Sequence, residues 1–451
     1  MKPTFSPVIK LVRRACSVAV ATLSLGAVAH PGPLAQYAQD CTGQAWVATW
    51  GTAPAGPPLP AAQQRFHNQT VRLIVHTSIG GSQVRVRLSN ERGATPLRIG
   101  AAHVALRLAG ADTVPGSERA LTFSRFSSIT IPAGAPAVSD PVELSVPAMA
   151  DLALSLHLPG EVHASTIHNN GRQTNYVSLP GNYSGAAAFP TERIIFSWPF
   201  VSEVDVQSSG AAVVVLGDSI TDGALTTHGA NSRWPDLLAL RLRNTGDLEV
   251  QRTDRLVRAN TDVGVVNRGV GGNRLLRDRP ADPLAGISAL ARFDRDVLAT
   301  AGVKHVIVLI GIHDIAATSA ATGSANQAVT VDELIAGYRQ LIARAHDNGI
   351  AIYGGTITPF EGAANPGYYT ADKELVRQAV NHWIRTGDEF DAVIDFERAV
   401  RDPSRPSRML PAFDSGDHLH PNDLGMQAMA NAIPLNLFRT VPLMRGVHCA
   451  K

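Results

Sequence analysis

The spacing of apolar residues changes once along this chain, close to residue 210. Before that point, short apolar or alternating runs such as 71–77 and 84–89 are punctuated by Gly and Pro, and no segment keeps a helical period. The pattern predicts an all-β domain over residues 42–205, with a hairpin at Gly80-Gly81. Short strands at this spacing are typical of a β-sandwich, and a jelly-roll-like sandwich is the expected form.

After residue 210, apolar runs alternate with amphipathic segments. Residues 331–348 place apolar side chains at i, i+3 and i+4, as in a helix that covers a sheet. Repeated strand–helix units imply a parallel sheet with helices on both faces, here over residues 211–440. The predicted strands are 211–216, 263–267, 305–310, 350–354 and 392–396.

The first 29 residues have the features of a signal peptide. Basic residues precede an apolar stretch at 15–29, and this stretch ends in the small-x-small sequence AVA at 27–29. The stretch is too short for a membrane span. We therefore expect a signal peptide over residues 1–29 and a secreted or periplasmic protein.

The composition of the mature chain limits the cellular compartments and the binding partners that we expect for it. Its two cysteines are Cys41 and Cys449, for which a disulfide is expected in an oxidising compartment and two free thiols are the alternative. The net charge of +2 and the lack of basic runs argue against nucleic acid as the main partner. No later apolar run is long enough for stable membrane insertion.

Candidate chemistry begins at Gly217-Asp218-Ser219. The unbroken apolar run over 211–216 suits a strand that is buried on both faces of a parallel sheet. Gly217 permits a sharp turn at the carboxyl end of this strand, where open α/β sheets bind ligands. A hydroxyl at that edge is placed to attack a carbonyl, and the alternative for Ser219 is a helix N-cap.

Further reactive groups lie in three later loops, which a doubly wound sheet brings to the same edge. These loops are 267–273 with its Gly-rich turn, 311–314 and 417–421. Ester hydrolysis needs a nucleophile, a base, a group that orients the base and donors for the oxyanion. Asp417 can orient His420 as the base, while the backbone N–H groups of Ser219 and Gly272 can donate to the oxyanion.

These four blocks, in this order, resemble those of the SGNH/GDSL hydrolases: GDSI at 217–220, the glycine turn, a G-x-x-D loop and D-x-x-H-P. The resemblance covers residues 211–440 and implies a flavodoxin-like three-layer α/β/α fold around a five-stranded parallel sheet. It implies no cofactor, and it carries over four site residues: Ser219 as nucleophile, Gly272 as oxyanion donor, and Asp417 and His420 as the other triad members. The β-rich front, with WVATWG at 46–51, is similar to the accessory domain of some secreted bacterial members.

The third block departs from the family pattern. That pattern is G-x-N-D, but this chain has Gly311-Ile312-His313-Asp314. The missing Asn normally lends a side-chain N–H to the oxyanion, and a neutral histidine can still donate one N–H. Three interpretations of His313 stay open: a substitute donor, a weakened oxyanion hole, or an element of altered specificity.

Several other side chains flank the predicted cleft. Trp234, Asn273 and Arg274 are expected to contact substrate or to support the loops. The D-x-x-H spacing favours His420 as the base over its neighbour His418, which is expected to point away.

No metal site is expected. Asp218, Asp222 and Asp314 are interpreted as capping and supporting residues, and the turn at 269–272 lacks the Lys-Ser/Thr of a phosphate loop. The histidines of the predicted β domain lack metal-site spacing and are interpreted as structural or surface residues. They are His76, His103, His157, His163 and His168.

The expected function is that of a secreted serine esterase acting through an acyl-enzyme, with acylated carbohydrate or other polymeric esters as candidate substrates. Simple short-chain or lipid esters are further candidates, and acyl transfer to an alcohol would use the same residues. The alternative is a degenerate SGNH protein, disabled at His313, that acts as a carbohydrate- or surface-binding module. The intact Ser219, Asp417 and His420 argue against this alternative.

Overall fold

A computed structural model of the chain describes residues 45–244, 262–317 and 329–438. The expected signal peptide and the cysteines Cys41 and Cys449 lie outside the described residues, so both remain predictions. Within the described ranges, no helix is long and apolar enough to cross a membrane.

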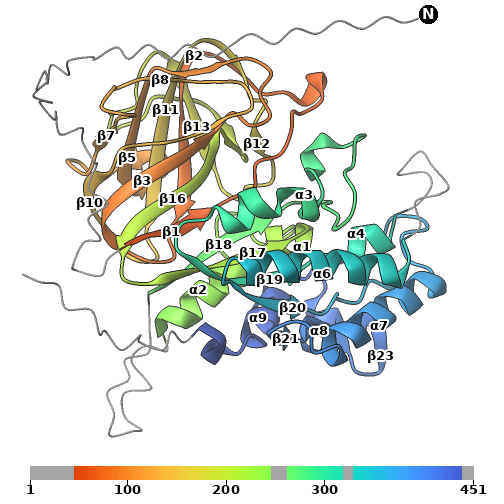
Figure 1. Cartoon of the computed structure of the whole chain (residues 1–451). Coiled ribbons are helices and arrows are strands. Elements are labelled where there is room, and N and C mark those ends of the chain that lie inside the picture. Colours follow the sequence, from red (N-terminus) through yellow and green to blue (C-terminus); the bar gives the residue numbers. More distant parts are fainter. Residues whose placement is uncertain (1–44, 245–261, 318–328, 439–451) are drawn as a thin grey trace, which may run out of the picture. The chain divides into compact units, whose positions relative to one another are not determined.

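Residues 45–208, called the β region here, consist of antiparallel strands in two main sheets of five and seven strands (Figure 1). The five-stranded sheet has the order β1 (Ala45–Gly51), β16 (Val201–Ser208), β3 (Gly81–Ser89), β10 (Val142–Val146), and β9 (Pro136–Val138) also pairs with β3. The seven-stranded sheet has the order β14 (Thr191–Ile195), β13 (Asn175–Pro180), β2 (Arg65–His76), β11 (Asp151–His163), β5 (Ala101–Ala109), β6 (Asp112–Thr113), and β7 (Arg119–Leu121) also pairs with β5. Two short pairs complete the region: β4 (Leu97–Ile99) with β8 (Ile129–Ile131), and β12 (Ile167–His168) with β15 (Trp198–Pro199).

One hydrophobic core joins the two main sheets. Leu73 of β2 and Leu154 of β11 are buried in the same cluster as Val86 of β3 and Val204 of β16. Alternating side chains of each strand thus turn inward, as the period-two pattern requires. The prediction of a strand-rich region is confirmed, and the jelly-roll connectivity stays a prediction.

The predicted hairpin at Gly80-Gly81 is wrong, because β2 and β3 belong to different sheets. β2 pairs with β11 and β13, whereas β3 pairs with β16 and β10. The turn between them is held by β1 instead: the backbone N–H of Ser78 donates to the Thr49 carbonyl over 2.9 Å, and that of Ile79 donates to Thr49 Oγ1 over 3.0 Å. Strands that adjoin in sequence therefore serve opposite sheets of the core.

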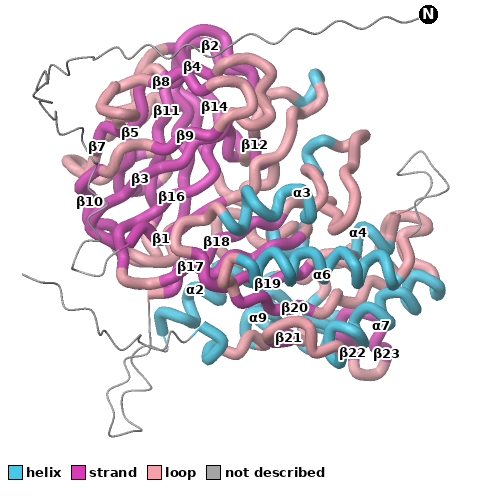
Figure 2. Tube along the Cα trace, in the orientation of Figure 1, coloured by secondary structure: helices cyan, strands magenta, loops and turns pink. Residues whose placement is uncertain are grey.

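Residues 211–438 are called the α/β region here. Its described residues contain five parallel strands in the order β18 (Val263–Gly269), β17 (Ala211–Gly217), β19 (Val303–Leu309), β20 (Ala351–Gly355), β21 (Ala392–Ile394). This is the flavodoxin-like strand order, and the five predicted strands are confirmed. The helices are α1 (Ser219–Asp222), α2 (Trp234–Asn244), α3 (Ala289–Phe293), α4 (Ile312–Ile315), α6 (Val331–Asp347), α7 (Ala371–Thr386), α8 (Phe396–Val400) and α9 (Asp423–Asn431). A short pair, β22 (Arg401–Asp402) with β23 (Arg405–Met409), lies beyond α8 in sequence. Figure 2 shows the change from strands alone to alternating strands and helices.

Consecutive residues of β17 point to opposite faces of this sheet, and every residue of the strand is buried. Val214 packs in the cluster that contains Leu341 of α6. Val213 packs in the other cluster, with Leu238 of α2 and Met426 of α9. Helices on both faces explain why the sequence of β17 is apolar throughout rather than alternating.

The β region covers the β18 edge of the parallel sheet. The Ala48 N–H of β1 donates to the Ala301 carbonyl over 2.9 Å, and the Val265 N–H of β18 donates to Ser78 Oγ over 2.9 Å. The buried Arg268 guanidinium forms an ion pair with Glu203 of β16. An edge strand that would otherwise expose unpaired backbone groups is thereby protected.

Candidate active site

The end of β17 brings Ser219 to the carboxyl edge of the parallel sheet. A Cβ at Gly217 would overlap Thr221 Oγ1 and the Leu309 carbonyl, so the chain can turn here only with glycine. Asp218 is the N-cap of α1, because its Oδ1 accepts the Ile220 N–H over 3.0 Å. The capping role that was the alternative for Ser219 is thus filled by its neighbour, which leaves the Ser219 hydroxyl available.

A chain of hydrogen bonds joins Ser219, His420 and Asp417. His420 Nε2 lies 2.7 Å from Ser219 Oγ, and His420 Nδ1 lies 2.5 Å from Asp417 Oδ2. Because Nδ1 donates to the carboxylate, Nε2 is left to accept the hydroxyl proton. The loop that carries Asp417 and His420 directly precedes α9, 201 residues away from Ser219 along the chain.

The Asp417 carboxylate is stabilised in its charged form. Burial raises its pKa, but hydrogen bonds from the His420 ring and from the backbone N–H groups of His420 and Leu419 outweigh burial and hold the pKa well below its usual range. A permanent negative charge at this position favours the imidazolium that forms when His420 takes a proton.

The neighbouring His418 faces elsewhere. Its Nδ1 bonds to Asp414 Oδ2, its φ is 60°, and its side chain is 52% exposed. The structure therefore places His420, and not His418, against the serine.

His313 is a second histidine whose ring lies close to the serine hydroxyl. It occupies the first turn of α4, and its Nε2 is 3.4 Å from Ser219 Oγ. Burial, assisted by the nearby Arg279, His420 and Arg274, lowers the pKa of His313 to about 3, so the imidazole is neutral at physiological pH. A neutral imidazole has one N–H to offer, which makes its tautomer important.

Tyr368 is a site residue that sequence reasoning missed. Its hydroxyl lies 2.6 Å from His313 Nδ1, and the two rings meet edge to face at 75°. The residue belongs to the loop between β20 and α7, which carries none of the four sequence blocks. No motif signal distinguishes this tyrosine from Tyr369 beside it.

The glycine turn after β18 lies against α1. The Val270 N–H donates to the Gly217 carbonyl over 3.1 Å, and the Gly271 N–H donates to Asp222 Oδ2 over 3.2 Å. Gly272 has a φ of 77°, and a Cβ there would stand 2.5 Å from Arg279 Nη1. The turn thus needs glycine at this position and is held by a carboxylate of α1, the helix that begins with Ser219.

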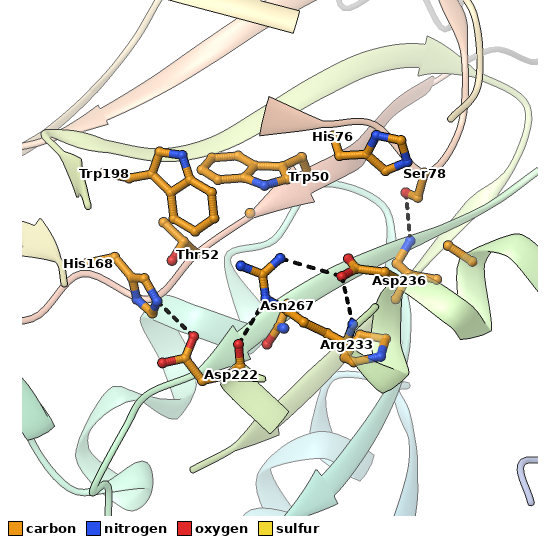
Figure 3. A pocket seen from close by; sticks show the side chains of 14 residues that line it. Trp50, Thr52, His76, Ser78, His168, Trp198, Asp222, Arg233, Asp236 and Asn267 are labelled. Atoms are coloured by element: carbon orange, nitrogen blue, oxygen red, sulfur yellow. Dashed lines mark hydrogen bonds and ion pairs between the residues drawn. The ribbon is translucent and has the colours of Figure 1, made fainter. Parts of the chain in front are cut away.

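The same carboxylate connects the site with the β region (Figure 3). Asp222 Oδ1 lies 2.9 Å from His168 Nε2, and both side chains are only 4% exposed. His168 Nδ1 lies 3.2 Å from the Ala53 carbonyl, so both of its ring nitrogens face oxygen atoms. A histidine interpreted from sequence as structural therefore supports the residue that holds the glycine turn.

Of the two alternatives for Trp234 and Asn273, substrate contact or loop support, the burial of both side chains favours loop support. Trp234 is fully buried, with its ring 5.2 Å from that of Phe396. The Asn273 amide donates to the Ala285 and Ile287 carbonyls over 2.7 and 2.8 Å. Trp234 thus supports its surroundings by ring packing, and Asn273 supports the loops by hydrogen bonds. Arg274 is also buried, and its charge acts on His313 and Tyr368.

The three aspartates of the site have separate partners. Asp314 accepts the backbone N–H groups of Leu275 and Leu276 over 2.7 and 3.0 Å, while Asp218 and Asp222 make the contacts described above. Burial raises the pKa of Asp218 to about 7 and that of Asp314 to about 6. Within the described ranges, no three His, Cys, Asp or Glu side chains are grouped as a metal site requires.

The family model of the GDSL-like lipases/acylhydrolases matches residues 213–433. No curated protein sequence matches the chain. The chain is similar to the solved structures of an acetyl xylan esterase from Geobacillus stearothermophilus (20% identity, 52% of this chain and 99% of that chain, TM-score 0.36) and of a GDSL-like lipase from Bacteroides thetaiotaomicron (17% identity, 49% and 84%, TM-score 0.33).

The match to the family model spans the parallel sheet from β17 to β21, the serine at the end of β17, and the loop that carries Asp417 and His420. The α/β region of this chain belongs to the GDSL-like lipase/acylhydrolase family.

Proposed function

We propose that the protein is a serine esterase that hydrolyses carboxylic esters through an acyl-enzyme on Ser219. The observation that carries the proposal is the hydrogen-bond chain from Asp417 through His420 to the serine hydroxyl. His420 Nε2 takes the hydroxyl proton as Oγ bonds to the ester carbonyl carbon. The same proton then goes to the leaving alcohol as the carbon–oxygen bond breaks, and a water molecule activated by His420 releases the acid.

The negative charge on the carbonyl oxygen needs donors. We assign this role to the backbone N–H groups of Ser219 and Gly272 and to His313 Nε2, which lies beside Ser219 Oγ. Among the three interpretations of His313, the position of this nitrogen favours a substitute donor. His313 would then supply the N–H that the Asn side chain supplies in the family pattern.

The substrate class and the compartment are part of the proposal. Acylated carbohydrates or other polymeric esters are the substrates we expect first, by analogy with secreted proteins that carry a β-rich domain. Secretion rests on the signal-peptide pattern at 1–29. The same residues would also transfer the acyl group to an alcohol, so the products of the reaction should be identified as well as quantified.

Hydrolysis of p-nitrophenyl acetate and butyrate tests the function. Ser219→Ala and His420→Ala should each lower kcat by about 10⁴-fold or more, because the nucleophile and its base act as a unit. His418→Ala is the matched control: it removes a histidine from the same loop that does not face the serine, and activity should persist.

Labelling with a fluorophosphonate gives a second readout, since only an activated serine should react. Wild-type protein that neither turns over nor labels would contradict the proposal. The degenerate binding module would then be the better interpretation, and binding of oligosaccharides to the β region would be measured next.

A further inference from the structure

We propose that Tyr368 is a positioning residue that fixes the tautomer of His313, so that the Nε2–H of His313 points to where the oxyanion forms. This inference rests on the proposed ester hydrolysis and adds a residue outside the four sequence blocks. It concerns the one position of the site where the chain departs from the family pattern.

The geometry places one polar group at each nitrogen of the imidazole. The Tyr368 hydroxyl lies 2.6 Å from Nδ1, and Ser219 Oγ lies 3.4 Å from Nε2. The shorter contact is a hydrogen bond of full strength, whereas the longer one leaves room for adjustment as a substrate oxygen arrives. The ring is therefore held from the tyrosine side and available on the serine side.

Two neutral tautomers of His313 are possible, and their consequences are opposite. If Nδ1 accepts from Tyr368, the ring proton lies on Nε2 and can be donated to the oxyanion. If Nδ1 carried the proton, the lone pair of Nε2 would face Ser219. That lone pair would compete with His420 for the hydroxyl proton and would repel a negatively charged oxygen.

The protonation states of the neighbours favour the first tautomer. Burial, aided by the carboxyls of Asp218 and Asp314, raises the pKa of Tyr368 well above its usual range, so the phenol keeps its proton. That proton needs an acceptor. Among the residues that the structure describes, His313 Nδ1 is the one hydrogen-bond partner of the hydroxyl. The low pKa of His313 keeps a lone pair on its ring.

The tyrosine is held independently of His313. Its backbone N–H donates to the Asn365 carbonyl over 3.0 Å, and Lys373 Nζ donates to the Gly367 carbonyl over 2.6 Å. The same loop reaches the triad, since the Ala364 N–H donates to the Asp417 carbonyl over 3.2 Å. Because its loop is anchored at these points, Tyr368 can fix the orientation of the His313 ring.

A double-mutant cycle tests the inference. Tyr368→Phe should lower kcat for p-nitrophenyl butyrate by about 5- to 20-fold with little change in KM, because one neutral hydrogen bond is lost and part of the population adopts the wrong tautomer. In the His313→Asn background the same change should alter kcat less than about 2-fold, because an amide donor has no tautomer to fix. Tyr369→Phe is the matched control, since Ser407, and not His313, is the polar uncharged side chain that acts on the Tyr369 hydroxyl.

A spectroscopic measurement decides the tautomer directly. In protein with ¹⁵N-labelled histidine, the His313 signal is the one that disappears in His313→Asn. We expect the proton on Nε2 in the wild-type protein and a mixture of tautomers in Tyr368→Phe. Equal thermal stability of wild type and Tyr368→Phe would show that the fold is intact.

Two results would overturn the inference: a wild-type His313 that carries its proton on Nδ1, or an equal loss of kcat from Tyr368→Phe in both backgrounds. Failure of the proposed function looks different, because the wild-type protein would then hydrolyse no ester while the spectrum still reports the tautomer.

Discussion

Replacement of His168 by leucine should lower both the stability of the protein and its catalytic activity. His168 and Asp222 are 2.9 Å apart and almost inaccessible to solvent, so His168→Leu leaves one oxygen of a buried carboxyl group without its partner. Loss of one partner of a buried ion pair costs about 3–5 kcal/mol, and an unsatisfied buried polar group costs about 1–3 kcal/mol. We expect about 3 kcal/mol, where these ranges meet, because the Gly271 N–H still binds the other oxygen of Asp222.

His168→Leu should also affect catalysis, because Asp222 holds the glycine turn. Asp222 Oδ2 holds the Gly271 N–H at 3.2 Å, directly before the proposed donor Gly272. When His168 no longer fixes Asp222, this turn loses rigidity, and we expect kcat to fall more than KM rises. Urea unfolding gives the free energy of unfolding, and p-nitrophenyl butyrate kinetics under folding conditions give kcat and KM.

Two further variants sharpen the result. His168→Gln keeps an N–H that can reach Asp222 and should recover most of the lost stability. His103→Leu is the matched control, because His103 bonds to Ser184 Oγ within the β region. A free energy of unfolding of His168→Leu that lies within about 0.5 kcal/mol of the wild-type value would refute the energetic argument. Reduced stability with unchanged kcat would refute the connection to the turn.

Three other perturbations have defined outcomes. Burial raises the pKa of Asp218 to about 7, so the contribution of the protonated carboxyl to stability is complete below about pH 4 and is lost as the pH rises through 7. Asp218→Asn keeps the helix cap without this loss. In urea titrations, the free energy of unfolding of Asp218→Asn relative to that of wild type should therefore rise between pH 5 and pH 8. Because the pKa of His313 is about 3, His313→Asn should change the plateau of kcat/KM against pH but not the position of its acid limb; a displaced acid limb would show that His313 titrates there. Gly272→Ala should lower kcat by tenfold or more, because the φ of 77° strains a residue with a side chain by about 1–2 kcal/mol and the new methyl group would meet Arg279. Gly271→Ala should lower kcat less, because its Cβ would meet only Asp222 Oδ2 at 3.9 Å.

The amino-acid sequence by itself determined the features that depend on neighbouring residues. The five strands of the parallel sheet were predictable because a strand buried on both faces needs an unbroken apolar run, as β17 shows. Ser219, Asp417 and His420 could be chosen because each stands in a short block whose spacing limits its geometry. Even the choice of His420 over His418 followed from such local spacing.

Only the tertiary structure decided which distant groups meet. β2 and β3 adjoin in sequence but pair in different sheets, because strand partners are selected by the core as a whole. Tyr368 reaches His313 across 55 residues, and His168 reaches Asp222 across 54. Packing and hydrogen bonding over such separations leave no periodic or motif signal, because any loop of suitable length can carry the partner. Three-dimensional contacts were thus needed to favour one of the three interpretations of His313, whereas the proposed nucleophile and base could be chosen from the sequence.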